Sequence, residues 1–392
     1  MADMSIAADI LEFTKAHPEI KTPYFLMDES RLLKNMEKMK YIRENGGTKT
    51  VLALKCFSTW SLFPLMREYM DGTTSSSLFE AKLGAEKFQK ETHAYAVGWK
   101  EEEIMEVRQF ATKIIFNSAN QLERFYDIAR GIPLGLRINP GMSYSHFDLA
   151  DPTRKFSRLG EKDITRVEKA IDAKMISGLM IHNNCENSDF DAFAKLIDDM
   201  GEKFGHLLEK LEWVTLGGGI FFTKEGYPLE KFAAKLADFS KKHGVTIYLE
   251  PGESSITRAG FLITSVMDII HNEMDVAILD AAANVHMPDL VTYGENARME
   301  LPILPADAEG PGYIYQLAGR TCLAGDVFGT FKFPDKLAVG SLVPIHDAAG
   351  YTIVQKSWFN GVPMPSIVVK RLDGKAEVVR TFNYEEYLSS FS

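Results

Sequence analysis

The sequence predicts an α/β protein in which a parallel (β/α)8 barrel is followed by a C-terminal antiparallel β-domain. Between about residue 50 and residue 250, short β-rich runs alternate with helix-like segments. After about residue 258, apolar or alternating runs follow one another without long helices between them. A length of 392 residues suits one large barrel with a smaller partner domain. A doubly wound open sheet is the alternative for the first half.

The barrel prediction depends on eight strand-like runs and on the helical periodicity between them. The runs cover 50–55, 73–77, 92–98, 113–118, 133–139, 176–183, 213–218 and 246–250. Helices are predicted at 101–110, 120–130, 190–211 and 229–243, with a further helix-like stretch at 7–15. The run at 73–77 is a poor strand, so the alternation carries more weight than the count.

The second half reads as a β-domain. Its strand-like runs cover 260–270, 277–280, 312–317, 341–345 and 366–369. The segment 371–375 contains Asp373-Gly374, a pair that suits a primed hairpin turn. We therefore place the barrel at 23–257 and the β-domain at 258–392, with 1–22 as a candidate addition to the β-domain.

Composition excludes several classes of protein. With 45% hydrophobic and 25% charged residues, the chain is typical of a globular protein. No apolar run reaches the roughly 18 residues that a membrane span needs, and the N-terminus lacks the features of a signal peptide. Three cysteines without a CxxC motif disfavour a disulfide framework and a metal site. A net charge of −10 disfavours nucleic acid as a partner. We expect a cytoplasmic protein with neither a nucleic-acid nor a membrane partner.

Lys55 is the most informative single residue. It follows the apolar run 50–54, so we expect its amine to be buried at a strand end. Burial lowers the pKa of a lysine, and a neutral amine attacks aldehydes, which suggests a lysine that holds pyridoxal phosphate (PLP). Considered alone, a lysine paired with a carboxylate in the barrel mouth is the more frequent case.

Other polar residues follow the predicted strands at the same end of the barrel. They are Arg137, His182, the glycines Gly217–Gly219, and Glu250. Each has an ordinary structural explanation: an ion pair, a satisfied histidine, a tight turn and a helix cap. Their conjunction with Lys55 brings an amine, an imidazole, a phosphate-sized glycine turn and a carboxylate to one face, which favours a catalytic site.

Several phrases of the sequence resemble the fold-type III PLP-dependent decarboxylases, the alanine racemase-like barrel group that includes diaminopimelate, ornithine and carboxynorspermidine (carboxyspermidine) decarboxylases. The phrases are 52–57 (LALKCF), 180–184 (MIHNN), 216–220 (LGGGI), 249–253 (LEPGE), 319–326 (GRTCLAGD) and 347–352 (DAAGYT). They cover nearly the whole chain in order. The resemblance is greatest to the polyamine branch of the family.

The resemblance implies roles for the matching residues. Lys55 would hold PLP as an imine, His182 would stack on the pyridine ring, and Glu250 would keep the ring nitrogen protonated. Arg137 would support the cofactor near the barrel mouth. The residues implied to bind the phosphate are Gly218, Gly219, Gly252 and Tyr351.

The resemblance also implies a head-to-tail homodimer with shared active sites. Cys322 would reach the site of the partner subunit and help to return a proton to the product. Asp326 would lie beside it and contribute to substrate binding.

Two departures from the family pattern bear on the substrate. Glu253 stands where diaminopimelate and ornithine decarboxylases have arginine, and Leu323 stands where they have an acidic residue. An anion in place of a cation favours a polycationic tail, as in carboxynorspermidine and carboxyspermidine, over a second carboxylate. His286 and Asp289 are further candidates for substrate contact, with turn residues as the alternative.

Three other functions compete with this interpretation. A diaminopimelate- or ornithine-type decarboxylase is disfavoured by Glu253. An amino-acid racemase would be expected to place arginine, not Glu250, against the pyridine nitrogen. A non-catalytic PLP carrier would lack the second domain and the phrase around Cys322.

Overall fold

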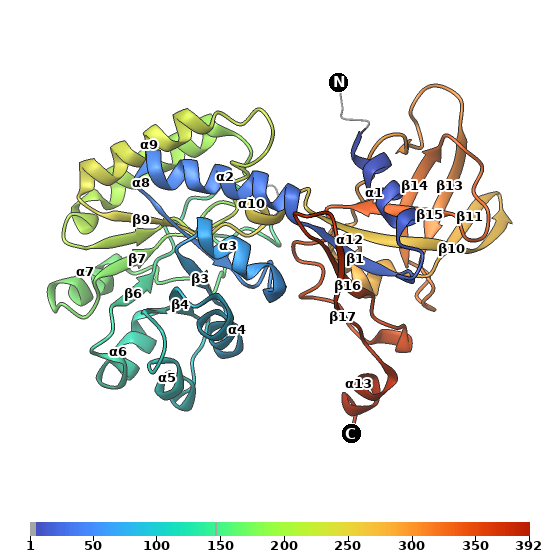
Figure 1. Cartoon of the computed structure of the whole chain (residues 1–392). Helices are drawn as coiled ribbons and strands as arrows, with labels where there is room; N and C mark the ends of the chain where they lie inside the picture. Colours follow the sequence, from blue (N-terminus) through green and yellow to red (C-terminus); the bar gives the residue numbers. More distant parts are fainter. Residues whose placement is uncertain (1–4, 146) are drawn as a thin grey trace. The chain divides into compact units, whose positions relative to one another are not determined.

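The computed structural model describes residues 5–145 and 147–392. The chain forms two compact units, shown in Figure 1: one holds Leu33–Ser255, and the other combines the described residues up to Leu32 with Ile256–Ser392. These limits differ from the predicted ones at the start of the barrel. Strand β1 (Tyr24–Asp28) belongs to the second unit, because it pairs with β10 (Gly260–Asn272) and β16 (Ser366–Lys370).

The first unit is a closed barrel of eight parallel strands, which confirms the predicted fold and rules out an open sheet. Each strand lies in or next to one predicted run. In chain order they are β2 (Lys49–Ala53), β3 (Gly72–Thr74), β4 (Glu91–Tyr95), β5 (Lys113–Phe116), β6 (Leu134–Arg137), β7 (Gly178–Met180), β8 (Trp213–Thr215) and β9 (Thr246–Leu249). Pairing of β2 with β9 closes the ring.

Helices precede, connect or follow the barrel strands and lie outside them (Figure 1). They are α2 (Glu29–Gly46), η1 (Trp60–Leu62), α3 (Phe63–Tyr69), α4 (Leu78–Leu83), η2 (Gly84–Phe88), α5 (Glu101–Val107), α6 (Ala119–Ala129), α7 (Ile164–Asp172), α8 (Phe190–Leu208), α9 (Leu229–His243) and α10 (Glu253–Ile256). The N-terminal cap of α6 is Ser118, whose hydroxyl accepts from the Gln121 N–H, so this helix begins one residue earlier than predicted.

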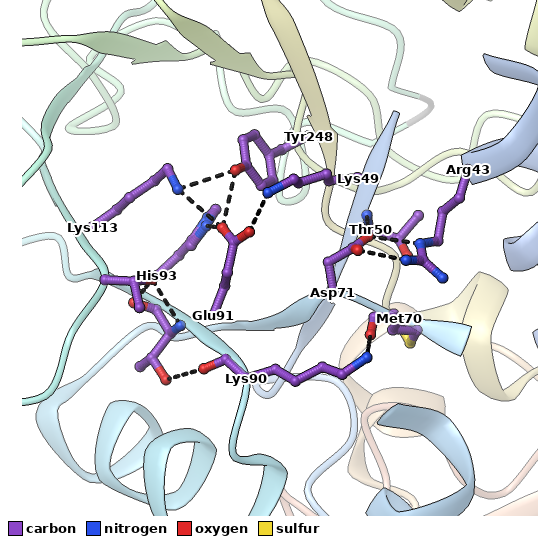
Figure 2. A network of polar contacts seen from close by, with 12 residues as sticks. Arg43, Lys49, Thr50, Met70, Asp71, Lys90, Glu91, His93, Lys113 and Tyr248 are labelled. Carbon is purple, nitrogen blue, oxygen red and sulfur yellow. Dashed lines mark hydrogen bonds and ion pairs between the residues drawn. The ribbon is translucent and has the colours of Figure 1, made fainter. Parts of the chain in front are cut away.

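The barrel interior separates an apolar layer from a charged network at the strand starts. The apolar and aromatic layer consists of Val51, Tyr95, Ile115, Met180, Trp213 and Tyr248. Below it, Glu91 accepts from Lys49, Lys113 and the Tyr248 hydroxyl and lies 3.2 Å from His93 Nε2 (Figure 2). Because Lys49, Glu91 and Lys113 each begin a strand, this network closes the end of the barrel opposite the predicted site.

The second unit is a mostly antiparallel sheet, as predicted, although β1–β16 and β11–β13 pair in parallel. Its order is β12-β14-β13-β11-β10-β1-β16-β17, with β15 also paired to β10. The remaining strands are β11 (Met274–Leu279), β12 (Leu304–Pro305), β13 (Tyr313–Ala318), β14 (Val327–Phe333), β15 (Leu342–His346) and β17 (Ala376–Arg380). Its short helices are α1 (Ser5–Ala16), α11 (Ala283–His286), α12 (Pro288–Tyr293), η3 (Phe359–Gly361) and α13 (Tyr384–Ser389).

The predicted hairpin joins β16 and β17, but its turn is not a primed one. Gly374 has φ +83° and donates to the Arg371 carbonyl, while Asp373 is not in the left-handed region. The turn is therefore of the three-residue kind that ends in a left-handed glycine. The N-terminal stretch predicted as helical is α1, whose Ile10 and Phe13 join the core of this sheet.

Candidate functional site

Lys55 lies at the carboxyl end of β2, in the turn that follows the strand. The strand ends at Ala53, and the Cys56 N–H donates 3.0 Å to the Ala53 carbonyl. The expectation that Lys55 is buried at the strand end is wrong, because the residue is exposed. Its charge nevertheless lowers the pKa values of His182, Glu250, Glu80 and Cys185, so all four side chains lie near it.

His182 follows β7 and is held against the glycine turn after β8. Its Nδ1 accepts a 3.3 Å hydrogen bond from the Gly218 N–H. Burial, and then the positive charges of Lys55 and Arg137, lower the pKa of His182 well below its usual value. The imidazole is thus neutral at physiological pH, with its proton on Nε2.

Glu250 directly follows β9 and is 8% exposed. Its Oε1 accepts a 2.8 Å hydrogen bond from the Thr215 hydroxyl. Burial raises the pKa of Glu250, while the Thr215 hydroxyl and the charges of Lys55 and Arg137 lower it. A buried carboxylate that is oriented by a hydroxyl and lies near two cations is suited to accept a hydrogen bond from a protonated ring nitrogen.

Arg137 ends β6 and is 5% exposed. Its Nη1 donates 2.8 Å to the Tyr95 hydroxyl, and its guanidinium carbon lies 5.4 Å from the centre of the Tyr95 ring. The structure therefore brings a buried cation to the same end of the barrel as Lys55, His182 and Glu250.

The glycines after β8 and β9 are required by close backbone contacts. A Cβ on Gly218 would lie 2.3 Å from the Glu250 carbonyl, and one on Gly219, which has φ +79°, would lie 2.2 Å from the Asn184 carbonyl. A Cβ on Gly252 would lie 2.7 Å from the Cβ of Cys56. These turns bring bare backbone to the end of the barrel, which is the arrangement that cradles a phosphate.

Glu253, half-buried, begins α10 directly after the Glu250-Pro251-Gly252 turn. Two further residues near Lys55 were missed by the sequence reasoning. Glu80 accepts from the Ser76 N–H, and burial raises its pKa. Cys185 is a half-buried free thiol with a raised pKa. The signal for both was available, since each follows a predicted barrel strand.

The other predicted site residues belong to the sheet unit. Cys322 is an exposed free thiol in the loop between β13 and β14, and its N–H donates 2.8 Å to Asn360 Oδ1. Asp326 is 3% exposed and accepts from the N–H groups of Ala283 and Thr321 at 2.7 and 3.0 Å. The Thr321 hydroxyl donates a further 2.6 Å bond to it. Asp326 thus uses its oxygens to fix the loop that carries Cys322, which argues against the predicted substrate contact.

His286 is also a structural residue. It is fully buried, its Nδ1 accepts from the Ala282 N–H at 3.1 Å, and burial lowers its pKa to about 3. This environment favours the structural alternative over substrate contact. Asp289 lies in the first turn of α12 and is half-buried. Tyr351 has φ +53° and lies in the turn region that follows β15.

The barrel side chains fit a flat cationic heterocycle with a phosphate. A neutral imidazole offers a ring face, a buried carboxylate offers an acceptor, and the crowded Gly219 and Gly252 offer N–H groups, while the Gly218 N–H donates to His182. Among the described residues, no group of three or more His, Cys, Asp and Glu is placed to hold a metal ion. In the same part of the chain, no helix has both the length and the apolar character that crossing a membrane requires.

Comparison with known proteins gives a family and close relatives. Residues 24–349 match the family model described as pyridoxal-dependent decarboxylase, C-terminal sheet domain. The carboxynorspermidine/carboxyspermidine decarboxylase of Herminiimonas arsenicoxydans is 49% identical over 95% of this chain and 100% of its own length. The carboxyaminopropylagmatine decarboxylase of Synechocystis is 34% identical over 98% of each chain. The crystal structure of carboxynorspermidine decarboxylase from Campylobacter jejuni, complexed with norspermidine, superposes with a TM-score of 0.86 at 35% identity, covering 95% of this chain and 100% of that one.

Proposed function

The chain belongs to the pyridoxal-dependent decarboxylase family, and we propose that it converts carboxynorspermidine and carboxyspermidine to norspermidine, spermidine and CO2. The observation that carries the proposal is end-to-end similarity, at 49% identity, to a relative named for these two substrates. The neighbouring structure that contains norspermidine supports a polycationic product for this fold. The site agrees, because it joins Lys55 with a neutral imidazole and a buried carboxylate.

The cofactor that fits this site is PLP. When bound, it acts as an electron sink for the pair of electrons left by the departing carboxylate. Lys55 Nζ would hold it covalently, and the imidazole of His182 would stack on its ring. Glu250 would accept a hydrogen bond from the protonated ring nitrogen. The N–H groups of Gly219 and Gly252 would bind its phosphate, while the Gly218 N–H, predicted for the same role, donates to His182 Nδ1. Tyr351 stays a proposed phosphate ligand.

The protein residues then control charge and protons around the reacting atoms. A neutral His182 would add no second positive charge beside the cofactor, and Glu250 would stabilise the protonated ring nitrogen by a charge-assisted hydrogen bond. Arg137 adds a buried positive charge that favours the ionised form of Glu250. Cys322, or a water molecule that it positions, returns a proton to the product carbon.

Glu253 is our candidate for substrate choice. A carboxylate at this end of the barrel attracts the amines of a polycationic tail and repels a second substrate carboxylate. The guanidinium tail of carboxyaminopropylagmatine is also cationic, and a relative at 34% identity is named for it. This compound is therefore the second candidate substrate.

The proposal is tested by CO2 release and kcat/KM, measured side by side for carboxynorspermidine, carboxyspermidine, carboxyaminopropylagmatine, diaminopimelate and ornithine. We expect the first two substrates to be preferred. Lys55→Ala should abolish both turnover and the visible absorbance of the bound cofactor. A preference for diaminopimelate, or turnover by Lys55→Ala without added amine, would refute the proposal.

We also propose that the enzyme is a head-to-tail homodimer in which Cys322 serves the site of the partner subunit. Light scattering should give twice the chain mass of 44.0 kDa. Mixing inactive Lys55→Ala with impaired Cys322→Ala subunits should restore about a quarter of the parental activity, since half of the dimers are mixed and each has one intact site. No recovery after subunit exchange would contradict shared sites.

The cytoplasm is the compartment that we propose. All three cysteines have free thiols, of which Cys322 is exposed, and a reducing compartment preserves such thiols. Cell fractionation that places the enzyme elsewhere would overturn this assignment.

A further inference from the structure

The guanidinium of Arg137 is held by a neutral phenol. Its Nη1 donates 2.8 Å to the Tyr95 hydroxyl and its carbon lies 5.4 Å from the Tyr95 ring centre. Both side chains are almost fully buried, at 5% and 6% exposure. A buried cation without a hydrogen-bond acceptor is costly, so the hydroxyl of Tyr95 helps to fix where this charge lies.

The Tyr95 hydroxyl is in turn hydrogen-bonded to Asn117, which follows β5. It donates 2.9 Å to Asn117 Oδ1, and the same oxygen accepts from the Gly160 N–H at 2.9 Å. Asn117 Nδ2 donates 2.8 Å to the Arg158 carbonyl. A continuous relay therefore runs from the guanidinium at the end of β6 to the chain that connects β6 to α7.

The donor and acceptor roles along this relay agree with one another. Burial raises the pKa of Tyr95, so its phenol keeps the proton that it donates to Asn117. Arg137 can only donate, so the phenol oxygen must be its acceptor. The Tyr95 hydroxyl and the Asn117 amide thus each have defined partners, which favours a rigid arrangement.

We propose that Tyr95 is a positioning residue that holds the Arg137 guanidinium near His182 and Glu250, and that Asn117 couples this position to the β6–α7 connection. The inference rests on the proposed cofactor site, whose ring partners are those two residues.

The position of this charge matters because Arg137 acts on both ring partners at once. Burial lowers the pKa of His182, and the charge of Arg137 lowers it further. Burial raises the pKa of Glu250, and the charge of Arg137 opposes that rise. A displaced guanidinium would let both groups take up a proton at a higher pH. Both changes would weaken the hold on a cationic ring.

The test is Tyr95→Phe, which removes one oxygen, with Tyr248→Phe as the matched control. Tyr248 belongs to the same interior cluster and is also buried, but its hydroxyl donates 3.0 Å to Glu91 at the other end of the barrel. PLP dissociation constants are measured by absorbance titration of the apoenzymes across a pH series, with thermal midpoints alongside. We expect Tyr95→Phe to bind PLP about tenfold more weakly and to lose it at a higher pH on acidification.

Tyr248→Phe should lower the thermal midpoint without changing PLP affinity or its pH dependence. Equal PLP affinity and equal pH dependence in the two variants would overturn the proposal. The coupling to Asn117 is tested by combining Tyr95→Phe with Asn117→Ala. The double variant should bind PLP no more weakly than the single variant with the lower PLP affinity. If the fold-losses of PLP affinity in the two single variants instead multiplied in the double variant, the relay would be overturned.

These titrations use no substrate, so their outcome is separate from that of the proposed function. If no polyamine precursor is turned over but Tyr95→Phe alone weakens PLP binding, the proposed substrate fails and the positioning role stands.

Discussion

The hydroxyl of Thr215, the last residue of β8, donates a 2.8 Å hydrogen bond to Oε1 of Glu250, which follows β9. The two strands are paired in the barrel wall, with Thr215 opposite Tyr248. The bond orients the carboxyl group and favours its ionised form, against a burial that favours the protonated form. Thr215 therefore supports the role that we propose for Glu250, although the sequence reasoning did not select it.

Thr215→Val should move the acid limb of the kcat profile to higher pH. Removing the hydroxyl raises the pKa of Glu250 further, because the hydrogen bond lowered it. The ionised fraction of Glu250 is then lost earlier as the pH falls, while activity on the alkaline side stays close to that of the parent. The measurement is kcat against pH for parent and variant. Superimposable profiles would remove Thr215 from the site.

Gly219→Ala should cost most of the affinity for PLP. A Cβ at this position would lie 2.2 Å from the Asn184 carbonyl, and φ is +79°, so the turn cannot persist. Gly226→Ala is the matched control, since Gly226 has φ +75° in the same unit but nothing within 4 Å of an added Cβ. In both variants the positive φ destabilises the turn by about 1 kcal/mol, and only in Gly219→Ala does the added Cβ also collide with a neighbouring carbonyl.

The affinities come from absorbance titration of PLP into both apoenzymes, with parental protein alongside. If Gly226→Ala lost as much affinity as Gly219→Ala, backbone strain would explain the result and the glycine cradle would not.

The barrel could be predicted because its strand runs and the helices between them follow local rules. Helix α9 has its predicted limits, and each barrel strand lies in or beside one run. Strand β1 was assigned to the wrong part of the molecule, since a five-residue apolar segment does not specify its partners. Its pairing with β10 and β16 joins residues more than 200 positions apart.

The site was predictable as a set of strand ends but not as an electrostatic arrangement. The sequence places Lys55 after an apolar run, yet the residue lies exposed in the turn that follows β2. The sequence around His286 does not distinguish a buried histidine from one that contacts substrate. Only the structure shows that His286 is buried. Tyr95 lies in the middle of an apolar pattern, and its link to Arg137 joins β4 to β6 across the strand β5 that lies between them.

Asp326→Asn should destabilise the sheet unit and disorder the Cys322 loop. The carboxylate accepts from Ala283 N, Thr321 N and the Thr321 hydroxyl. The NH2 group of an asparagine would face one of these N–H or O–H donors and lose that hydrogen bond, which costs about 1–3 kcal/mol of folding stability. We expect a lower thermal midpoint and a lower kcat with little change in KM. A raised KM at an unchanged midpoint would instead restore Asp326 as a substrate ligand.

Glu253→Arg should lower kcat/KM for carboxynorspermidine by about tenfold or more, because a cation would face the polycationic tail. The same change should raise the relative use of diaminopimelate, whose second carboxylate it attracts. Glu212→Arg is the control: this exposed residue precedes β8 and makes the same change in net charge at the other end of the barrel. Equal kcat/KM ratios in the two variants would show that only net charge matters.

His93 should make the stability of the barrel depend on pH in a defined window. It is fully buried beside Glu91, and burial lowers its pKa to about 4 from 6.5. Between these values the folded state binds fewer protons than the unfolded chain, so stability is complete above pH 6.5 and falls as the pH drops toward 4. The pKa of Glu91 is lowered, so the stability that its carboxylate contributes is lost only below its usual value of 4.5, outside this window.

His93→Gln should therefore remove about 2 kcal/mol of the change in the free energy of unfolding between pH 6.5 and 4.5, measured by urea denaturation. His271→Gln, at an exposed histidine, should keep the parental slope, and an equal slope in His93→Gln would mean that His93 does not set the acid sensitivity of the barrel.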